Sequence, residues 1–369
     1  MSPSAPTIPI STYRVSPEAE ELVLQVLRSG QLAQGPMVQK LEDLSADMAG
    51  SKYAVAFSNG TATLISALIA HGIGPGDEVI TSPFTFVATL NAILFTGATV
   101  VFADIDPETY CIDPAAIEAA LTSNTKAIMP VHIFGQSADM TKIGEIAEKN
   151  SLVIIEDAAQ AHGALWNSQP VGSFGTGSFS FYTTKNVGCG EGGIVTTNDF
   201  DIAHTLGLLR NQGMKERYKY ERVGWNFRLT DLQAAVAIPQ MECLDQSNKK
   251  RNSTVQRYND AFSDIDALVT PVIREEAYSV WHQYSLRVVD SSQRDGILAG
   301  LSEKGVGAGV YYPRPVFEYE PYMDNKNVQI SSCDVTRSVC ESVFSIPVHH
   351  YLSEQDVDRV IEGVSDVAS

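Results

Sequence analysis

Lys185 stands in a stretch of sequence whose residue types could do chemistry. The stretch reads SFSFYTTKNVGCGEGG, over residues 178–193, and places the lysine between a strand-like run and a loop with four glycines in six positions. A lysine at a strand end is either a solvated surface charge or an amine that reacts with a carbonyl group. The glycines would let the backbone pass close to a ligand. The rest of the chain must decide between the two interpretations.

An acidic pair closes an apolar run earlier in the chain. The sequence LVIIEDAAQAHGA, over residues 152–164, ends its apolar part at Glu156 and Asp157, and Gln160 and His162 follow. An acid at the end of a buried parallel strand is either a helix cap or a functional carboxylate. Asp157 and His162 could ligate a metal ion, but no third and fourth ligand has suitable spacing, so we expect no metal site.

A glycine turn between a strand and a helix offers a place for a phosphate group. It lies in SNGTATLISALIAHG, over residues 58–72. The free backbone N–H groups and the positive dipole at the start of a helix suit a phosphate. A plain turn capped by Ser58 or Thr61 explains the segment equally well.

The phosphate turn, the acid and the lysine follow one another in an order that points to one cofactor. Pyridoxal phosphate requires a phosphate cup, an acid against its pyridine nitrogen and a lysine that binds it as a Schiff base. Each feature alone has an ordinary explanation. Coincidence explains all three in this order poorly.

The elements that would position these residues alternate along the first two thirds of the chain. Strand-like runs at 53–57, 77–81, 99–105, 126–135 and 152–157 alternate with helical segments at 62–72, 113–121 and 140–150. This alternation predicts a mostly parallel sheet covered by helices on both faces, with ligands at the carboxyl ends of the strands.

The pattern changes near residue 245. A polar helix at 246–262, strands at 284–289 and 307–313, and helices at 295–305 and 353–364 follow. We therefore predict a large domain over residues 1–245, which includes an N-terminal arm, and a smaller α+β domain over residues 246–369.

Composition excludes several classes of function. The chain of 369 residues has a net charge of −18, which argues against binding to nucleic acid through bulk electrostatics. It has no apolar run long enough to cross a membrane and no secretory signal at its start, so we expect a cytoplasmic protein. Its five cysteines are odd in number and lack CxxC spacing, so neither a disulfide framework nor a zinc site is indicated.

Six sequence blocks resemble a known family. They are SNGTATL, PFTFVAT, EDAAQAHGA, SFYTTKNVGCGEGG, GWNFRLTDLQAA and VYYPRP, in this order. The chain resembles the DegT/DnrJ/EryC1/StrS group of sugar aminotransferases, within fold type I of the pyridoxal-phosphate enzymes. The resemblance implies an α/β fold with a large cofactor-binding domain, a mostly parallel central sheet and a smaller C-terminal α+β domain.

The resemblance also implies roles for individual residues. It makes Lys185 the lysine that binds the cofactor, Asp157 the partner of the pyridine nitrogen and Gln160 a donor to the ring's 3-oxygen. It implies that an aromatic ring, Phe84, stacks on the cofactor, although this residue could equally belong to the core. The phosphate contacts that it implies are Gly60, Thr61, Ala62 and Ser180.

Asn226 and Arg228, in the block GWNFRLTDLQAA, carry an expectation about assembly. In the family, the asparagine reaches the phosphate in the neighbouring subunit, which implies a homodimer with two shared sites. Arg228 either holds the carboxylate of the amino donor or forms an ordinary ion pair.

The block VYYPRP is expected near the sugar nucleotide. Tyr311, Tyr312 and Arg314 belong to a segment that approaches this substrate in relatives, although tyrosines on a buried strand are also common core residues. Many relatives have histidine shortly after this motif, where this chain has Phe317. Because of that difference, the sugar contacts of a relative cannot simply be transferred to this chain.

The expected reaction moves an amino group from L-glutamate or L-glutamine to a keto sugar, carried on a nucleoside diphosphate as a 3- or 4-keto-6-deoxyhexose. Lys185 disfavours the 3-dehydratase branch of the family, which has histidine at this position. Two alternatives remain. The acceptor could be a cyclic ketone of the inosose or aminobenzoate type, or the protein could bind pyridoxal phosphate for regulation without turnover. The acidic charge and the lack of a DNA-binding segment speak against regulation.

Overall fold

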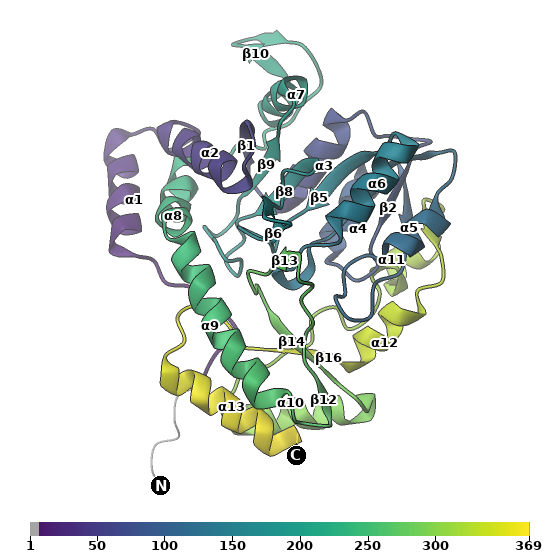
Figure 1. Cartoon of the computed structure of the whole chain (residues 1–369). Coiled ribbons are helices and arrows are strands. Elements are labelled where there is room, and N and C mark those ends of the chain that lie inside the picture. The colour runs from purple at the N-terminus through teal and green to yellow at the C-terminus, as the bar shows by residue number, and fades with distance from the viewer. Residues whose placement is uncertain (1–6, 369) are drawn as a thin grey trace.

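A central sheet of eight strands carries the fold. The structure is a computed structural model that describes residues 7–368 (Figure 1). The strand order is β1-β9-β8-β5-β4-β2-β3-β15, and all neighbours run parallel except β9, which is antiparallel to β1 and β8. The predicted α/β class with a mostly parallel sheet is confirmed. The strands are β1 (Tyr53–Phe57), β2 (Glu78–Thr81), β3 (Thr99–Phe102), β4 (Thr125–Met129), β5 (Val153–Asp157), β8 (Thr176–Ser180), β9 (Gly193–Thr197) and β15 (Val328–Ile330).

Helices cover both faces of this sheet. Successive side chains of a strand point to opposite faces, so Val79 packs in one apolar cluster with α3 and α4, and Ile80 packs in a second with α5 and α6. Both faces of the sheet are therefore shielded from solvent, as is usual for a parallel sheet. The helices before residue 243 are α1 (Pro17–Ser29), α2 (Pro36–Ala49), α3 (Gly60–Ala70), α4 (Val87–Phe95), α5 (Pro114–Ala120), α6 (Met140–Asn150), α7 (Phe200–Arg210) and α8 (Asp231–Glu242).

A second, antiparallel sheet follows the long helix α9, in the order β12-β14-β16. It has its own apolar cluster, in which Tyr258 and Phe262 of α9 pack against Tyr284 and Leu286 of β14. The elements are α9 (Leu244–Phe262), β12 (Leu268–Val269), β14 (Tyr284–Val288), α10 (Arg294–Glu303), α12 (Asp334–Ser342), β16 (Val343–Ile346) and α13 (Glu354–Ala368).

Several contacts cross the predicted division at residue 245, which stays a prediction. Strand β15 belongs to the C-terminal part of the sequence, yet it pairs with β3 at the edge of the large sheet. In the N-terminal arm, Ile8 accepts a hydrogen bond from Gly307 N at 2.8 Å and donates through its own N to Gly305 O at 2.8 Å. Strand β15 therefore packs with the large sheet, and the N-terminal arm packs with the C-terminal part of the chain.

The predicted strand at 307–313 is wrong. The described residues there form only an isolated bridge, between Gly309 and Ser345. Tyr312 has a left-handed backbone, with φ of 62°, and Pro313 has no N–H group, so neither residue suits a strand ladder. The predicted strand at 126–135 is shorter than expected, because β4 stops at Met129, just before Pro130.

The remaining elements are short. The hairpin of β10 and β11 projects beside α7 at the top of Figure 1. None of the helices in residues 7–368 has the length and apolar character needed to cross a membrane. The short strands are β6 (Leu165–Trp166), β7 (Gln169–Pro170), β10 (Met214–Glu216), β11 (Lys219–Tyr220) and β13 (Ala277–Tyr278), and the short helices are α11 (Glu320–Met323) and the 3₁₀ turns η1 (Ile133–Gly135), η2 (Ser291–Gln293) and η3 (Val316–Glu318).

Candidate active site

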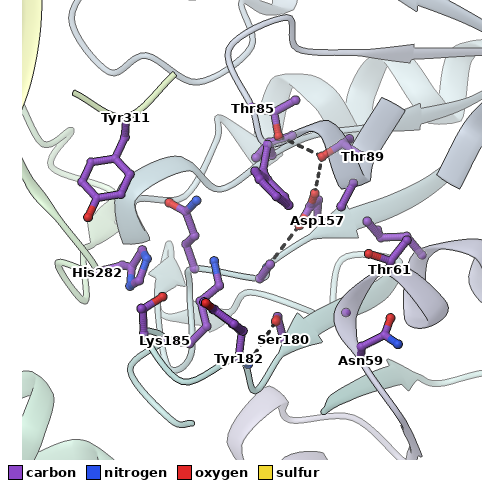
Figure 2. Close-up of a pocket in the computed structure, with 18 of the residues that line it drawn as sticks. Asn59, Thr61, Thr85, Thr89, Asp157, Ser180, Tyr182, Lys185, His282 and Tyr311 are labelled. Atoms are coloured by element: carbon purple, nitrogen blue, oxygen red, sulfur yellow. Dashed lines mark hydrogen bonds between the residues drawn. The ribbon is translucent and has the colours of Figure 1, made fainter. Parts of the chain in front are cut away.

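A cavity of about 1010 Å³ lies where the large sheet's strands end. Asp157 closes β5 and Ser180 closes β8, and both face this cavity, together with Lys185 and the first turn of α3 (Figure 2). Three sequence features that lie far apart along the chain are thus brought to one place. Parallel strands deliver their carboxyl ends to the same edge of the sheet, which explains the convergence.

Lys185 lies in a tight loop between β8 and β9. The loop closes through Phe181 N, which donates to Gly192 O at 2.8 Å, and Lys185 N donates to Tyr182 O at 2.8 Å. Burial lowers the pKa of the Lys185 amine to about 8, although the negative charge of Asp157 opposes this. A larger share of this amine is therefore uncharged at neutral pH than in an ordinary lysine, and only the uncharged amine can act as a nucleophile or base. The solvated interpretation of this lysine is wrong.

Asp157 is buried and its carboxylate is held from two sides. One oxygen accepts a hydrogen bond from the Thr89 hydroxyl at 2.6 Å, and the other accepts from Ala159 N at 3.2 Å. Thr89 is itself hydrogen-bonded at 2.8 Å to Thr85, which lies just before helix α4. Burial raises the pKa of Asp157, and the hydrogen bonds from Thr89 and Ala159 oppose that rise. No helix follows Asp157, so the helix-cap interpretation is wrong.

Its neighbour Glu156 points the other way and has a structural role. The Glu156 carboxylate accepts hydrogen bonds from Gly172 N at 2.8 Å and from Phe174 N at 2.9 Å, and it contacts His132 Nε2 at 3.2 Å. It does not line the cavity. The two consecutive acids therefore divide into one that organises a turn and one that faces a ligand space.

The first turn of α3 forms a cup against the end of β8. The Asn59 side chain caps the helix by accepting from Ala62 N at 2.8 Å, so the cap is neither Ser58 nor Thr61. This bond occupies the Ala62 N–H group and leaves those of Gly60 and Thr61 for a ligand. A Cβ atom at position 60 would lie 2.8 Å from the Ser180 Cβ, so only glycine fits there.

Gln160 has a fixed orientation at the opposite wall. Its Oε1 accepts from Phe134 N at 2.7 Å, and its Nε2 donates to the Tyr312 hydroxyl at 2.7 Å. The amide nitrogen has a second N–H group. Gln160 lines the cavity, so this group is available to an oxygen of a bound ligand.

The structure corrects the expected stacking residue. Phe84 has no exposed surface and packs edge-on against Tyr110, Phe134 and Tyr312, with ring centroids 5.5–6.2 Å apart. It does not line the cavity, whereas Phe86 does and is 60% exposed. Phe84 therefore belongs to the core, and Phe86 is the ring available for stacking. The block PFTF offers two aromatic residues, and only the path of the chain after β2 separates them.

The residues expected near the sugar divide into two groups. Tyr311 and Tyr312 line the cavity. Arg314 does not, and its guanidinium lies over the Tyr319 ring at 5.2 Å. Asn226 and Arg228 also lie outside the cavity of their own chain, where Arg228 Nη1 donates to Asn211 Oδ1 at 2.7 Å.

Several site residues have weak or no sequence signals. Asn59 stands inside the predicted phosphate turn, and Thr89 follows Thr85 at helical spacing, so both could have been found locally. His282 comes from the segment before β14, far along the chain, and no local pattern marks it. Among the cavity-lining residues that sequence reasoning missed are Asn59, Thr85, Phe86, Thr89, Tyr182, His282 and Gln283.

These groups fit pyridoxal phosphate. A buried acid suits a protonated pyridine nitrogen, the glycine cup suits a phosphate, and an amine with a lowered pKa suits a Schiff base. Among residues 7–368, no group of three or more His, Cys, Asp or Glu side chains is placed to hold a metal ion.

Comparisons with known proteins agree with this chemistry. The profile of the DegT/DnrJ/EryC1/StrS aminotransferase family matches residues 14–365. The chain is 37% identical to a UDP-2-acetamido-2-deoxy-3-oxo-D-glucuronate aminotransferase of Pseudomonas aeruginosa, over 96% of this chain and 97% of that one. It is 36% identical to a GDP-perosamine synthase of Caulobacter vibrioides, over 98% of each chain.

A solved structure of DesV from S. venezuelae superposes with a TM-score of 0.93, at 33% identity and over 99% of each chain. The match therefore extends over both sheets as well as the cofactor end of the cavity. This chain belongs to the DegT/DnrJ/EryC1/StrS aminotransferase family and is a pyridoxal-phosphate-dependent aminotransferase.

Proposed function

We propose that this aminotransferase moves an amino group from L-glutamate or L-glutamine to a keto sugar carried on a nucleoside diphosphate, most specifically a 3- or 4-keto-6-deoxyhexose. The observation that carries the proposal is the pairing of Lys185 with the buried Asp157 in a cavity of about 1010 Å³. Pockets for one small molecule have volumes of roughly 300–1,000 Å³. This cavity lies at the upper end of that range, which suits a site that takes a substrate as well as a cofactor.

The names of two relatives support a nucleotide-linked substrate. One relative acts on a UDP-linked 3-oxo sugar acid, and the other makes a GDP-linked amino sugar. The two differ in nucleotide and in sugar, so they support the class of substrate and leave its identity to experiment.

The side chains have distinct tasks in the proposed reaction. When bound, pyridoxal phosphate supplies a ring that accepts the electrons left behind when a C–H bond breaks. Asp157, held by Thr89, keeps a negative charge next to the pyridine nitrogen. Lys185 Nζ removes the proton from the α-carbon of the amino donor, and in the second half-reaction it returns a proton to the sugar carbon that receives the amine.

The remaining contacts hold the ligand in place. The N–H groups of Gly60 and Thr61 and the Ser180 hydroxyl would bind the phosphate, and the second N–H of Gln160 would bind the ring oxygen. Phe86 would stack on the ring. These contacts orient the reacting carbon without taking part in proton transfer.

We also propose that the enzyme works as a homodimer. Asn226 and Arg228 do not line the cavity of their own chain, which suits residues that serve the site of a second copy. In such a dimer Asn226 would contact the phosphate, and Arg228 would hold the donor's carboxylate. Phe86 and Tyr182 expose 60% and 46% of their surface, and a second copy would cover such rings.

Absorbance spectroscopy tests the proposal in two steps. Protein loaded with pyridoxal phosphate should lose the absorbance band of the lysine-bound cofactor when L-glutamate or L-glutamine is added. It should recover the band when a suitable keto sugar nucleotide follows. Failure to bind the cofactor would overturn the assignment.

A substrate panel separates the alternatives. If the absorbance band of the lysine-bound cofactor returns with an inosose or another cyclic ketone, and not with any sugar nucleotide, the cyclic-ketone reaction is favoured. A band that no amino donor changes would favour a regulatory protein without turnover.

A further inference from the structure

His282 is a buried histidine that lines the cavity and has no task in the reaction described above. It lies just before β14, in a segment whose backbone is anchored by Val280 N, which donates to Gly135 O at 3.0 Å. Figure 2 shows the imidazole ring on the same side of the cavity as Lys185. The ring thus has a fixed place near the reactive amine.

The hydrogen bonds around His282 determine which ring nitrogen carries its proton. Asn186 Nδ2 donates to Val280 O at 2.9 Å and to Asn248 Oδ1 at 3.2 Å, so Asn186 Oδ1 is an acceptor. This oxygen lies 3.4 Å from His282 Nδ1, which must therefore be the N–H donor. A neutral His282 then carries its lone pair on Nε2.

The Nε2 atom has no partner among the described residues. Both nitrogens of the nearby His162 are sealed inside the protein without a hydrogen bond, whereas Nε2 of His282 is not sealed in this way. Since His282 lines the cavity, its free lone pair is available there.

The charges that face His282 keep it neutral. Lys185 approaches from the loop after β8, Arg251 from α9 and His162 from the loop after β5. Burial lowers the pKa of His282 well below its usual range, and the positive charges of Lys185 and Arg251 add to this effect. Two acids, Asp157 and Glu191, line the same cavity, and Asp157 acts on Lys185 by favouring its charged form.

We propose that His282 is a positioning residue: its Nε2 accepts a hydrogen bond from the Lys185 amine and so aims the lone pair of Lys185 at the substrate carbon. The proposal rests on the proposed function, in which Lys185 is the base. A free amine can rotate about its terminal bond, and only one orientation presents the lone pair to the carbon. An acceptor on one side fixes that orientation.

A neutral acceptor suits this task better than a charged one. A carboxylate at this position would stabilise the ammonium form of Lys185 and raise its pKa, which would remove the base. An imidazole that has only a lone pair to offer can orient the amine at a much smaller cost in basicity.

Variants of His282 in the loaded enzyme give the first test. We expect His282→Leu to slow the single-turnover reaction with the amino donor by roughly 10- to 100-fold, because small errors in alignment carry penalties of that size. His282→Gln, whose side-chain oxygen can accept a similar bond, should restore the rate to within a few-fold. The absorbance of the lysine-bound cofactor should stay unchanged in both, because Lys185 is not free in that state. The surface variant His204→Leu serves as the control.

Two outcomes of this test overturn the proposal. An undiminished rate in His282→Leu would show that the amine needs no acceptor. Equal losses of rate and of cofactor binding in the Leu and Gln variants would assign His282 a structural role only.

A second test needs no amino donor and no turnover. In the full chain freed of cofactor, acetic anhydride labels uncharged amines, and mass spectrometry of the Lys185 peptide against pH reports the pKa of that residue. His282→Glu should move the midpoint for Lys185 upward by at least about one pH unit, because an opposite charge in contact shifts a pKa by roughly 1–3 units. An unchanged midpoint would mean that the two side chains do not meet, whatever reaction the enzyme catalyses. The proposed function could fail while this result held.

Discussion

The cofactor end and the open end of the cavity differ in how their polar groups are held. At the cofactor end, Thr89 holds Asp157, and Phe134 and Tyr312 hold Gln160, all through hydrogen bonds of 2.6–2.7 Å. At the open end, the Tyr311 hydroxyl has no hydrogen bond with the described residues. Figure 2 shows Tyr311 on the far side of the cavity from the α3 cup.

This difference separates chemistry from substrate choice. Groups that are fixed before a ligand arrives lose little entropy on binding, and they can be tuned for one cofactor. Groups without a fixed hydrogen bond place fewer restrictions on the shape and polarity of the substrate. The same scaffold can therefore accept different ketones. Substitutions at the cofactor end should therefore affect every substrate, whereas those at the open end should affect only the ketone.

The largest effect is expected from Lys185→Ala. The variant has no amine to bind the cofactor or to carry the proton, so both half-reactions should fall to background. Stopped-flow absorbance with each substrate measures this. Lys215→Ala, at an exposed lysine paired with Glu221, is the control and should react normally. Turnover by the Lys185 variant would rule out its assigned role.

Asp157→Asn should give the next largest loss. The amide keeps the shape and can still accept from Thr89, but it removes the charge next to the pyridine nitrogen. We expect the single-turnover rate to fall by about 10²–10³-fold, the usual range for loss of one electrostatic group in a site. Glu156→Gln should instead lower the melting temperature, because that acid organises a turn outside the cavity. A rate loss in Glu156→Gln as large as in Asp157→Asn would break the distinction between the two acids.

Gly60→Ala should weaken cofactor binding by roughly 10- to 100-fold. The new methyl group would lie 2.8 Å from the Ser180 Cβ and push α3 away from β8, at a cost of about 1–3 kcal/mol. Equilibrium titration with pyridoxal phosphate measures the change. Gly144→Ala, in a helix with open space around the position, should bind normally. Unchanged affinity in Gly60→Ala would mean that the cup is not rigid.

The two phenylalanines of PFTF should behave differently. Phe86→Ala should weaken cofactor binding by about tenfold through loss of stacking, with little change in stability. Phe84→Ala should destabilise the fold by about 3–5 kcal/mol, because its ring is fully buried. Titration and chemical denaturation of both variants measure this. The reverse pattern would restore Phe84 as the stacking residue.

The smallest effect is expected at the open end. Tyr311→Phe should raise the KM for the ketone by a few-fold, through loss of a hydrogen bond worth about 1 kcal/mol, and leave the donor half-reaction unchanged. Steady-state kinetics with each substrate in turn measure this. A change in the donor half-reaction would show that the two ends are coupled.

Local sequence predicted the residues whose place follows from one element. Asp157, Gly60 and Ser180 lie at the end of a strand or the start of a helix, and Lys185 lies in the loop that follows β8, so their meeting at one edge follows from a parallel sheet. Phe84 was the wrong choice because two aromatic residues, two positions apart, fit the same block, and only three-dimensional packing separates them.

Long-range pairing limited the rest of the prediction. Strand β15 is short and pairs with β3 from far along the sequence, and His282 reaches the cavity from the C-terminal half of the chain. Tyr312, whose left-handed backbone ends any strand there, is bonded to Gln160 and stacks on Phe134, both far away along the sequence. No local sequence pattern predicts the pairing of β15, the position of His282 or the backbone conformation of Tyr312.

The walls of the cavity come from both ends of the chain, which has a consequence for biosynthesis. Ile10 and Ser11, near the start, line the cavity together with Ile346 and Val348, near the end, and Thr12 contacts His349 at 3.4 Å. On the ribosome, Ile10 and Ser11 emerge long before Ile346 and Val348. The large sheet can form earlier, but its cavity stays open on one side until then. Full-strength cofactor binding therefore has to wait until Ile346 and Val348 have been synthesised.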